Sequence, residues 1–501
     1  LYIRIPLSDL GNPNAIYFIA YMSYDGGFYA MNNSGYAITN SGSTISGYYG
    51  GIGLLSSGAT MWSNANTPIL GSSTNPTTGG KYSSVTLSST NSSVVTGGTN
   101  FQIIEGGRLS IDKASSLTID GNFQNYGSAS MESDSNEFSS LIIEGSTING
   151  NVTYNRWVNG ISTSSPTSLD PGWDLVGSPM TNGTLNVSDL ATDGTNFAIQ
   201  PYDNTDNTWN STNTAGTYTT NTAVGYSIAK TSAGTVGFTG VPSGKTTVNI
   251  SLTENMSGGG SGDRWNLISN PYPAYIALNG AAKNASSATL SLLWYNAIQA
   301  STDVLGYTDS EEGVWYWDGS NYETANNGST ALWAAPGQAF FVSAPVGGST
   351  FSFRSGSVTT QASIVSVSSG SSTGDDFISG DILEGNRGEL FISLGQNGLN
   401  RKTQIYFLDD VYDGLDSGYD TRTFPMGDNN TSIYTRLVQD DEGVNLAIQS
   451  LAYSEMWDKV IPLGINALSG EEMTISISHR TTPADLNIYL EDVLDGTMTN
   501  L

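Results

Sequence analysis

The side chains that could do chemistry in this sequence are mainly carboxylates and aromatic rings. The densest group of carboxylates is in the segment LDDVYDGLDSGYD, which contains five aspartates: Asp409, Asp410, Asp413, Asp416 and Asp420. Glycines between them allow sharp turns. Oxygen ligands on such a loop are what Ca²⁺ requires, although the spacing differs from that of an EF-hand. We interpret the segment as a candidate calcium loop, and the alternative is a solvated loop whose aspartates cap their own turns.

A short aromatic run is the second candidate site. The run WYWDGSNY contains Trp315, Trp317 and Tyr322 around an Asp-Gly turn, which indicates a hairpin tip. Exposed tryptophan and tyrosine rings can stack on sugar rings or become buried in a protein partner. Because strand residues alternate between faces, either the two tryptophans or Tyr316 between them should point into a core. Trp315, Trp317 and Tyr322 are therefore candidates for ligand binding, with burial in a sandwich core as the alternative.

Catalytic chemistry has few of the residues it needs. A Ser-His-Asp or Cys-His nucleophile requires an imidazole, and the single histidine, His479, stands at a predicted strand end, where a solvated side chain is the simplest interpretation. The sequence has no cysteine and no histidine cluster, so a zinc site is not expected. Two carboxylates could hydrolyse a glycosidic bond, but no motif locates such a pair. We expect no enzymatic activity in this segment and no cofactor apart from the candidate Ca²⁺.

Charge and composition restrict the partners. Acidic residues number 45 and basic residues 17, and the formal net charge of −28 repels nucleic acid and anionic membrane surfaces. No run approaches the ~18 to 20 consecutive apolar residues that a membrane helix needs, so direct membrane insertion is not expected. Leu1 opens directly into the alternating run LYIRIPL, and we expect a piece of a longer processed precursor.

Short alternating runs bounded by Gly, Asn, Asp and Ser recur along the chain and predict an all-β protein with several tandem domains. Residues 1–80 are expected to hold an incomplete N-terminal β-domain and a linker, with a hairpin turn at residues 25–27. Residues 81–155 contain closely spaced apolar pulses, such as those at 109–111 and 117–119. Such pulses are typical of the rungs of a β-solenoid, and an ordinary meander of short strands is the alternative.

An internal duplication follows. The segment GWDLVGSP, which contains Trp173, reappears as RWNLISNP, which contains Trp265, and the later landmarks GYSI and GFTG are matched in the same order by GQAFFV and FSF. Preserved order predicts two copies of one β-sandwich unit, at residues 156–260 and 261–375. The two tryptophans are then expected to be equivalent core anchors, and the proline after each strand should end it.

Residues 376–501 return to regular alternation in GELFISL, TQIYFL, NLAIQSL and MTISIS. Short alternating strands separated by turns predict an immunoglobulin-like or jelly-roll sandwich. The predicted architecture is therefore a short β-solenoid-like segment, two duplicated β-sandwich units and a C-terminal sandwich, all built from β-structure.

Several segments also carry a family resemblance: GNVTYNRWV, PGWDLVGSPM, DRWNLISNPYP, APGQAFFV, RKTQIYFLDD, DGLDSGYDTR and LNIYLED. Over about residues 90–501 the chain resembles the tail region of large secreted and cell-surface proteins of Bacteroidetes, chiefly flavobacteria. The resemblance implies export by the type 9 secretion system, with the export and surface-attachment machinery as partners. It also implies an extracellular or cell-surface location, either attached to the outer membrane or released. Such tails occur behind proteases, glycanases and adhesins alike, so the resemblance does not define an activity.

Together these features lead to one functional hypothesis and one alternative. The hypothesis is a structural and interaction segment of a large exported bacterial surface protein, adhesin-like, which binds glycans or surface proteins through rigid strands and variable loops. The alternative is a non-catalytic accessory tail, binding carbohydrate or protein, of a secreted hydrolase whose catalytic domain lies outside this segment.

Overall fold

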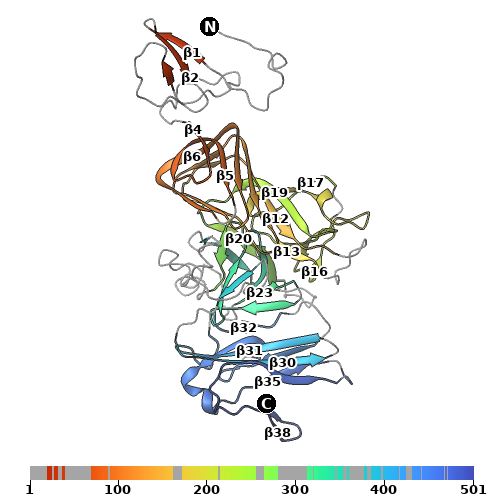
Figure 1. Ribbon diagram of the computed structural model, residues 1–501. Helices are drawn as coiled ribbons and strands as arrows, with labels where there is room; N and C mark the ends of the chain where they lie inside the picture. Colours follow the sequence, from red (N-terminus) through yellow and green to blue (C-terminus); the bar gives the residue numbers. More distant parts are fainter. Residues whose placement is uncertain are drawn as a thin grey trace.

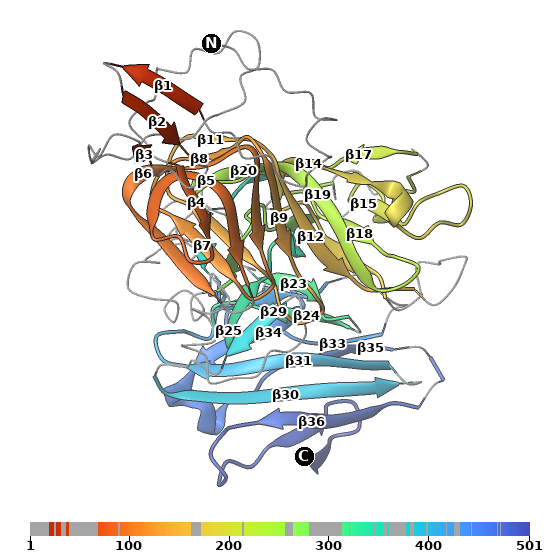
Figure 2. The ribbon, with the colours of Figure 1, turned by 45° about the horizontal axis from the view of Figure 1, so that its top comes forward.

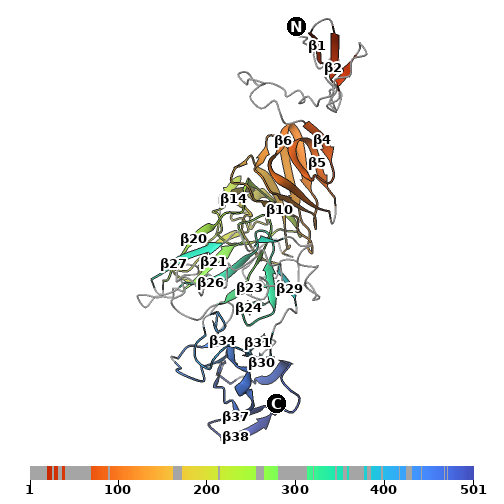
Figure 3. The same cartoon turned by 90° about the vertical axis from the view of Figure 1, so that its left-hand side faces the viewer.

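The computed structural model describes residues 20–24, 27–31, 37–39, 69–88, 91–161, 172–212, 215–255, 264–279, 313–319, 321–344, 347–353, 358–359, 377–380, 385–396, 399–416, 418–424, 431–441, 443–467, 469–470 and 472–501. In this part of the chain nearly all regular structure is β, which confirms the predicted fold class. Units stack along one long axis, from β4 (Ile69–Ser73) near one end to β38 (Thr497–Asn500) at the other (Figures 1 and 3).

A small sheet precedes the stack and contains three strands, β1 (Ala20–Tyr24), β2 (Gly27–Met31) and β3 (Ala37–Thr39). β1 and β2 pair antiparallel with Tyr24 opposite Gly27, which is the register of a two-residue hairpin. Of the expected turn residues, Asp25 and Gly26 lie outside the described residues, as do residues 40–68 of the expected linker, whereas Gly27 begins β2. The boundary expected between residues 80 and 81 is wrong, because β4 already pairs in parallel with the next strand of the solenoid.

The predicted solenoid is confirmed. Its strands are β4, β5 (Thr78–Leu87), β6 (Ser92–Ile111), β7 (Ser116–Ile119), β8 (Phe123–Asn125), β9 (Ser128–Glu132), β10 (Ser140–Ile143), β11 (Ile148–Asn149) and β12 (Val152–Val158). Parallel pairing stacks like residues: Leu87 pairs with Ile111, and Ile111 with Met131. All three are fully buried. Each rung therefore buries its apolar side chains by stacking on its neighbours.

Glycine is required where the solenoid turns stack. A Cβ atom at Gly127 would lie 2.1 Å from the carbonyl oxygen of Gly107, and one at Gly145 would lie 2.3 Å from that of Gly121. No side chain fits at such distances, so glycine is the residue that lets successive turns approach this closely.

The solenoid sheet continues into the next unit without a break. β12 pairs in parallel with β9 and antiparallel with β19 (Gly234–Pro242), whose other edge pairs with β14 (Met180–Asn186) and through it with β17 (Thr217–Thr219). The boundary expected between residues 155 and 156 therefore falls inside β12. Alternation in the sequence predicts a strand but not its pairing partners, so the sequence does not predict that one sheet continues from the solenoid into the first repeat unit.

The predicted duplication appears as two four-stranded sheets with the same strand order. The first contains β13 (Asp174–Val176), β18 (Tyr226–Ile228), β15 (Ile199–Asp203) and β16 (Thr208–Trp209); the second contains β21 (Trp265–Ser269), β26 (Ala339–Ser343), β23 (Val314–Trp317) and β24 (Tyr322–Ala325). β13 and β21 both end before their proline. The two tryptophans are not equivalent, because Trp265 is buried inside β21 whereas Trp173 precedes β13 and is half-buried against Ile161.

Further strands complete the second repeat unit: β20 (Val248–Leu252), β22 (Tyr275–Ala277), β25 (Ala331–Ala334), β27 (Ser349–Phe353), β28 (Val358–Thr359) and β29 (Phe377–Gly380). β20 pairs with β27, and β29 pairs with β25. Residues before the expected boundary at 260 and after the expected boundary at 375 therefore share sheets with this unit.

The C-terminal unit is one mixed sheet together with a separate hairpin. The sheet contains β30 (Arg387–Gln396), β31 (Leu399–Leu408), β32 (Thr421–Arg422), β33 (Ser432–Thr435), β34 (Leu446–Ala452), β35 (Leu463–Asn466) and β36 (Thr474–Arg480), and the hairpin pairs β37 (Tyr489–Asp492) with β38. β31 and β34 are parallel, whereas the expected immunoglobulin-like or jelly-roll sandwich would have two antiparallel sheets. Figure 2 shows β31 beside β30 and β36 on the other side of β30. β31 and β34 are separated in the chain by β32 and β33, and a connection of that length permits parallel pairing, which alternation cannot distinguish from a hairpin.

Both faces of this sheet are packed at its central strands, β31 and β34. One face carries Tyr406 and Leu408 and contacts the second repeat unit, where the Gln404 Nε2 donates to the Thr324 carbonyl oxygen at 3.4 Å. The opposite face carries Ile405 and packs against the 3₁₀ helix η4 (Tyr453–Asp458) and the residues that lead into β37.

Candidate functional site

The predicted aromatic site lies where three units meet. We define the junction cluster as Tyr202, Trp209, Trp265, Trp315, Trp317, Tyr322, Phe341 and Phe424. The first two come from the β15–β16 hairpin of the first repeat unit, and Phe424 follows β32 of the C-terminal unit. The remaining five lie on the β21–β26–β23–β24 sheet of the second repeat unit. The three candidate residues are therefore brought together, on a hairpin as predicted.

Phe424 is the centre of the junction cluster. Its ring centroid lies 4.8 Å from that of Phe341, 5.1 Å from that of Tyr322 and 5.4 Å from that of Trp315, on which it stacks. The indole Nε1 of Trp315 donates to the Arg422 carbonyl oxygen at 3.1 Å. Trp315, Trp317 and Tyr322 are half-buried, so parts of these rings pack between units and parts remain accessible to a ligand.

Tyr316 occupies the opposite face of β23, as alternation predicts. Its ring lies 4.4 Å from that of Phe377, between centroids, and burial raises the pKa of its hydroxyl. Burial likewise raises the pKa of the Tyr322 hydroxyl on the junction face. Neither tyrosine is therefore an acid near neutral pH, and both act through their rings.

The five aspartates of the candidate calcium loop lie close in the sequence but bond to different partners. Asp409 accepts a hydrogen bond from the Asn386 N–H (2.8 Å), and Asp413 forms an ion pair with Lys459. Asp416 accepts from the Tyr412 N–H (2.7 Å), and Asp420 accepts from the N–H groups of Asp416 (2.7 Å) and Ser450 (2.8 Å). Asp410 is exposed and has a φ of 61°. In the described residues, no group of three or more His, Cys, Asp or Glu side chains is placed to hold a metal ion. Ca²⁺ binding here stays a prediction.

Asp420 differs from the other four because it is fully buried. Burial raises its pKa well above the usual range, against the two N–H groups that stabilise the carboxylate and with some help from the neighbouring Asp416. The pKa of Asp416 is raised as well, again chiefly by burial. Asp420 therefore ties the acidic loop to β34 through the Ser450 N–H, and its charge is costly in that position.

The single histidine is exposed, as expected, and also paired. His479 Nε2 lies 2.6 Å from Glu389 Oε2, while the other oxygen of that carboxylate accepts from Arg387 Nε at 2.5 Å. The ring of His479 also packs against Phe391, with centroids 4.7 Å apart. Spacing could not reveal this pair, because the two residues lie on different strands that meet only in the folded sheet.

Arg156 holds a joint between units and was not predicted from the sequence. Its side chain is completely buried, with Nε donating to the Pro336 carbonyl oxygen at 2.9 Å and Nη2 to Gln338 Oε1 at 2.6 Å. Nη1 donates to the Trp157 carbonyl oxygen at 2.5 Å, and the guanidinium carbon lies 4.5 Å from the ring centroid of Phe138. One cation thus joins the solenoid sheet to the second repeat unit. A single arginine in an alternating strand gives no sequence signal for such a role.

The two repeat units also interlock through equivalent loops. The Gly177 N–H donates to the Gly337 carbonyl oxygen at 2.7 Å, and Gln338 Nε2 donates to the Leu175 carbonyl oxygen at 2.9 Å. In the other direction, the Ser269 N–H donates to the Ala223 carbonyl oxygen at 2.8 Å. These bonds make the two copies one packed body.

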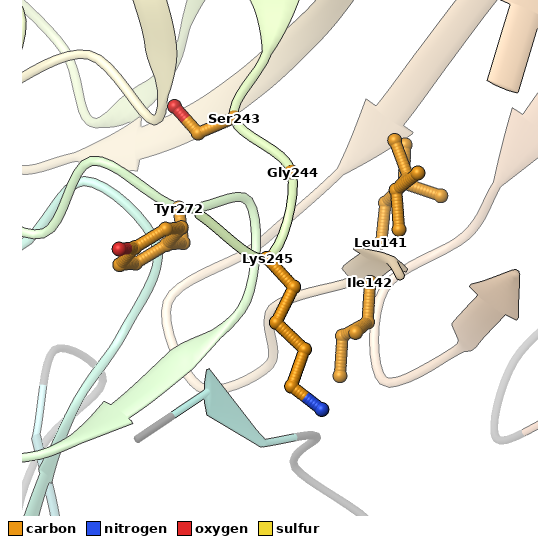
Figure 4. A pocket seen from close by; sticks show the side chains of 7 residues that line it. Leu141, Ile142, Ser243, Gly244, Lys245 and Tyr272 are labelled. Carbon is orange, nitrogen blue, oxygen red and sulfur yellow. The ribbon is translucent and has the colours of Figure 1, made fainter. Parts of the chain in front are cut away.

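A narrow hollow lies where the solenoid meets the second repeat unit (Figure 4). Its lining residues are Leu141, Ile142, Ile143, Ser243, Gly244, Lys245 and Tyr272. Backbone bonds cross this seam, from the Leu141 N–H to the Pro273 carbonyl oxygen (2.7 Å) and from the Lys245 N–H to that of Ile143 (2.8 Å). The hollow is therefore part of the joint between the units, and the junction cluster is the stronger candidate binding surface.

Fold and site together define a stacked all-β protein whose units are joined through buried side chains, with an aromatic cluster at one joint. The chain belongs to the family described as a domain of unknown function, DUF8693, which matches residues 57–501. No curated protein and no solved structure was found to match it. Among the described residues, no helix combines the length and apolar character that crossing a membrane would take.

Proposed function

We propose that this chain is a structural and interaction segment of a large exported bacterial surface protein, adhesin-like, which acts by binding and display. The observation that carries the proposal is the series of buried joints between successive units. Domains in tandem move relative to one another unless their interface is large and buried. A stack with buried joints holds its ends in a fixed relation, which is what a display segment must do.

Each joint uses a different kind of contact. The solenoid and the first repeat unit share the hydrogen-bonded ladder of β12. The second repeat unit is joined to both through Arg156 and Gln338. The C-terminal unit is joined through Phe424 in the junction cluster and through the ion pair of Lys402 with Glu323, at 2.5 Å. Backbone, buried polar and aromatic contacts together support a stiff segment.

The junction cluster supports the binding part of the proposal. Aromatic faces stack on sugar rings and anchor protein partners, and Trp209 and Trp317 leave part of their surface accessible. The indole nitrogen of Trp317 is buried and has no hydrogen-bond partner among the described residues, so the accessible part of this side chain is its ring face and edge. Glycans and surface proteins are therefore the ligand classes we propose.

The sequence resemblance supports the remaining parts of the proposal. Export by the type 9 system, surface attachment or release, and an extracellular location are proposed on that basis. The large negative charge is compatible with a protein kept soluble outside the cell, and Ca²⁺ at the acidic loop is proposed as a stabilising ion.

Binding of the 501-residue chain to a panel of glycans and bacterial surface proteins, with calcium and with a chelator, tests this function. We expect saturable binding that weakens in Trp317→Ala and is unchanged in Trp457→Ala, a tryptophan that is half exposed on η4. Small-angle X-ray scattering of the same chain should show one elongated particle of fixed shape. Turnover of a bound glycan or protein by the purified chain, or scattering typical of freely moving units, would contradict the proposal.

A further inference from the structure

The C-terminal hairpin presents an open strand edge. β37 and β38 form a two-stranded sheet of their own, and no strand of the described chain pairs with the outer edge of β38. All four residues of β38 are exposed, whereas Leu490 of β37 is partly buried. Figures 1 and 3 both place this hairpin at the far end of the stack. The edge is therefore accessible at the position most distant from the solenoid.

The alternation of hydrogen-bonded and non-hydrogen-bonded pairs in the hairpin identifies which backbone N–H and C=O groups of β38 point away from β37. The Leu501 N–H donates to the Ile488 carbonyl oxygen at 3.0 Å, which makes these two residues a hydrogen-bonded pair. Bonded and non-bonded pairs alternate in an antiparallel ladder, so Thr499 faces β37 and its neighbours do not. The N–H and C=O groups of Met498 and Asn500 therefore point away from β37, toward an incoming strand.

Natural edges of this kind are usually protected by lysine, proline or a bulge. From Ala484 to Leu501 the chain has no lysine, arginine or proline. Instead it carries four acids, Asp485, Glu491, Asp492 and Asp495, and an exposed apolar tip and face at Tyr489, Val493, Leu494 and Met498. Glu491 lies directly opposite Met498, so both project from the same face of the hairpin as Tyr489.

We propose that the outer edge of β38 is a docking site for an extended basic segment of a partner protein, which adds to the hairpin as a third strand. Strand addition takes its affinity from main-chain hydrogen bonds and its specificity from alternate side chains. A lysine or arginine of the incoming strand pairs with Glu491, while an apolar side chain packs on Met498. The negative charge of the hairpin favours a basic partner segment over a second copy of this chain, because two copies would bring two acidic hairpins together.

The test uses the full chain and a short fluorescent peptide of alternating valine and lysine, with a valine–glutamate peptide and a proline-interrupted valine–lysine peptide as matched probes. We expect saturable binding of the basic peptide by fluorescence anisotropy, weakening as salt is added. Met498→Pro removes one outward N–H without touching the hairpin's own ladder, and it should weaken binding about tenfold. Met498→Val keeps that N–H and should bind like the parent chain.

Amide hydrogen exchange separates docking at the edge from binding elsewhere. In the parent chain, bound peptide should slow exchange at Met498 and Asn500, while Thr499, already bonded to β37, should change little. Equal binding of the acidic peptide, unchanged exchange at the two outward amides, or unaltered affinity in Met498→Pro would overturn the proposal. So would sedimentation showing that β38 pairs two copies of the chain in place of the peptide.

Discussion

Replacing Arg156 with methionine should separate the units that its guanidinium joins. Methionine keeps much of the side-chain volume, so the change removes the donors and leaves little cavity. Three carbonyl-type acceptors lose a charged donor, at Pro336, Trp157 and Gln338, and the first and last of these bonds are fully buried. An unsatisfied buried acceptor costs about 1–3 kcal/mol. Allowing for partial relaxation, we expect a loss of about 3 kcal/mol, or roughly a hundredfold in the unfolding equilibrium.

Urea unfolding and amide exchange measure this effect at two levels. In the parent chain the solenoid and both repeat units should unfold together, because their joints are buried. In Arg156→Met the tryptophan fluorescence transition should move to lower urea and divide into two. Exchange should accelerate at the amides of Gly177 and Ser269, which donate across the joint to Gly337 and Ala223.

Arg108→Met is the matched control, because Arg108 is an exposed arginine on β6. That variant should unfold within about 0.5 kcal/mol of the parent chain. If Arg156→Met unfolds in one transition at the parent midpoint, with unchanged exchange at the joint, then the guanidinium does not hold the units together and the rigid-stack argument loses its central contact.

Three further substitutions test other parts of the structure. Phe424→Ala should cost about 2 kcal/mol because it empties the centre of the junction cluster, and tryptophan emission should shift to the red; an unchanged spectrum would mean that the C-terminal unit is not seated there. Gly127→Ala should cost about 1–3 kcal/mol because its Cβ meets the Gly107 carbonyl oxygen, whereas Gly395→Ala, with nothing nearer than 3.9 Å, should be neutral in the same thermal melts. Asp420 has a raised pKa, so the unfolded chain releases this proton near the ordinary 3.8 while the folded chain retains it to higher pH; folding stability should therefore fall as pH rises above that value. In Asp420→Asn, urea midpoints across the same pH range should lose that part of the slope, and an identical slope would contradict the buried-acid assignment.

The strands and the duplication could be predicted from sequence because both are local or ordered signals. Alternation marks a strand whatever its partner, and the matched landmarks around Trp173 and Trp265 preserve the strand order of two sheets. Which strands pair with one another cannot be predicted from alternation. The ladder from β9 through β12 to β19 joins segments that carry no common motif, and the parallel pairing of β31 with β34 depends on a crossover.

For the candidate sites too, local structure could be predicted from the sequence, whereas contacts between distant segments could not. The hairpin that carries Trp315 and Trp317 was predictable, but the Phe424 ring that fills their cluster comes from another unit. Five aspartates within one short segment suggested convergence on an ion, yet a loop can turn each carboxylate toward its nearest N–H group. Asp416 and Asp420 do this with Tyr412, Asp416 and Ser450.

The chain has few lysines and arginines, and the contacts of its arginines show how these few cations are used. With only 17 lysines and arginines in the chain, surface ion pairs cannot be a general source of stability, and exposed pairs contribute little in any case. Several arginines instead donate to backbone carbonyls: Arg156 to Pro336, Arg264 to Ala344 and Arg480 to Pro483. A guanidinium has five donors in a rigid fork, so one residue can hold several carbonyls at once. Lysine lacks that fork, and replacing Arg156 by lysine should therefore loosen the joint between the solenoid and the second repeat unit even though the net charge is unchanged.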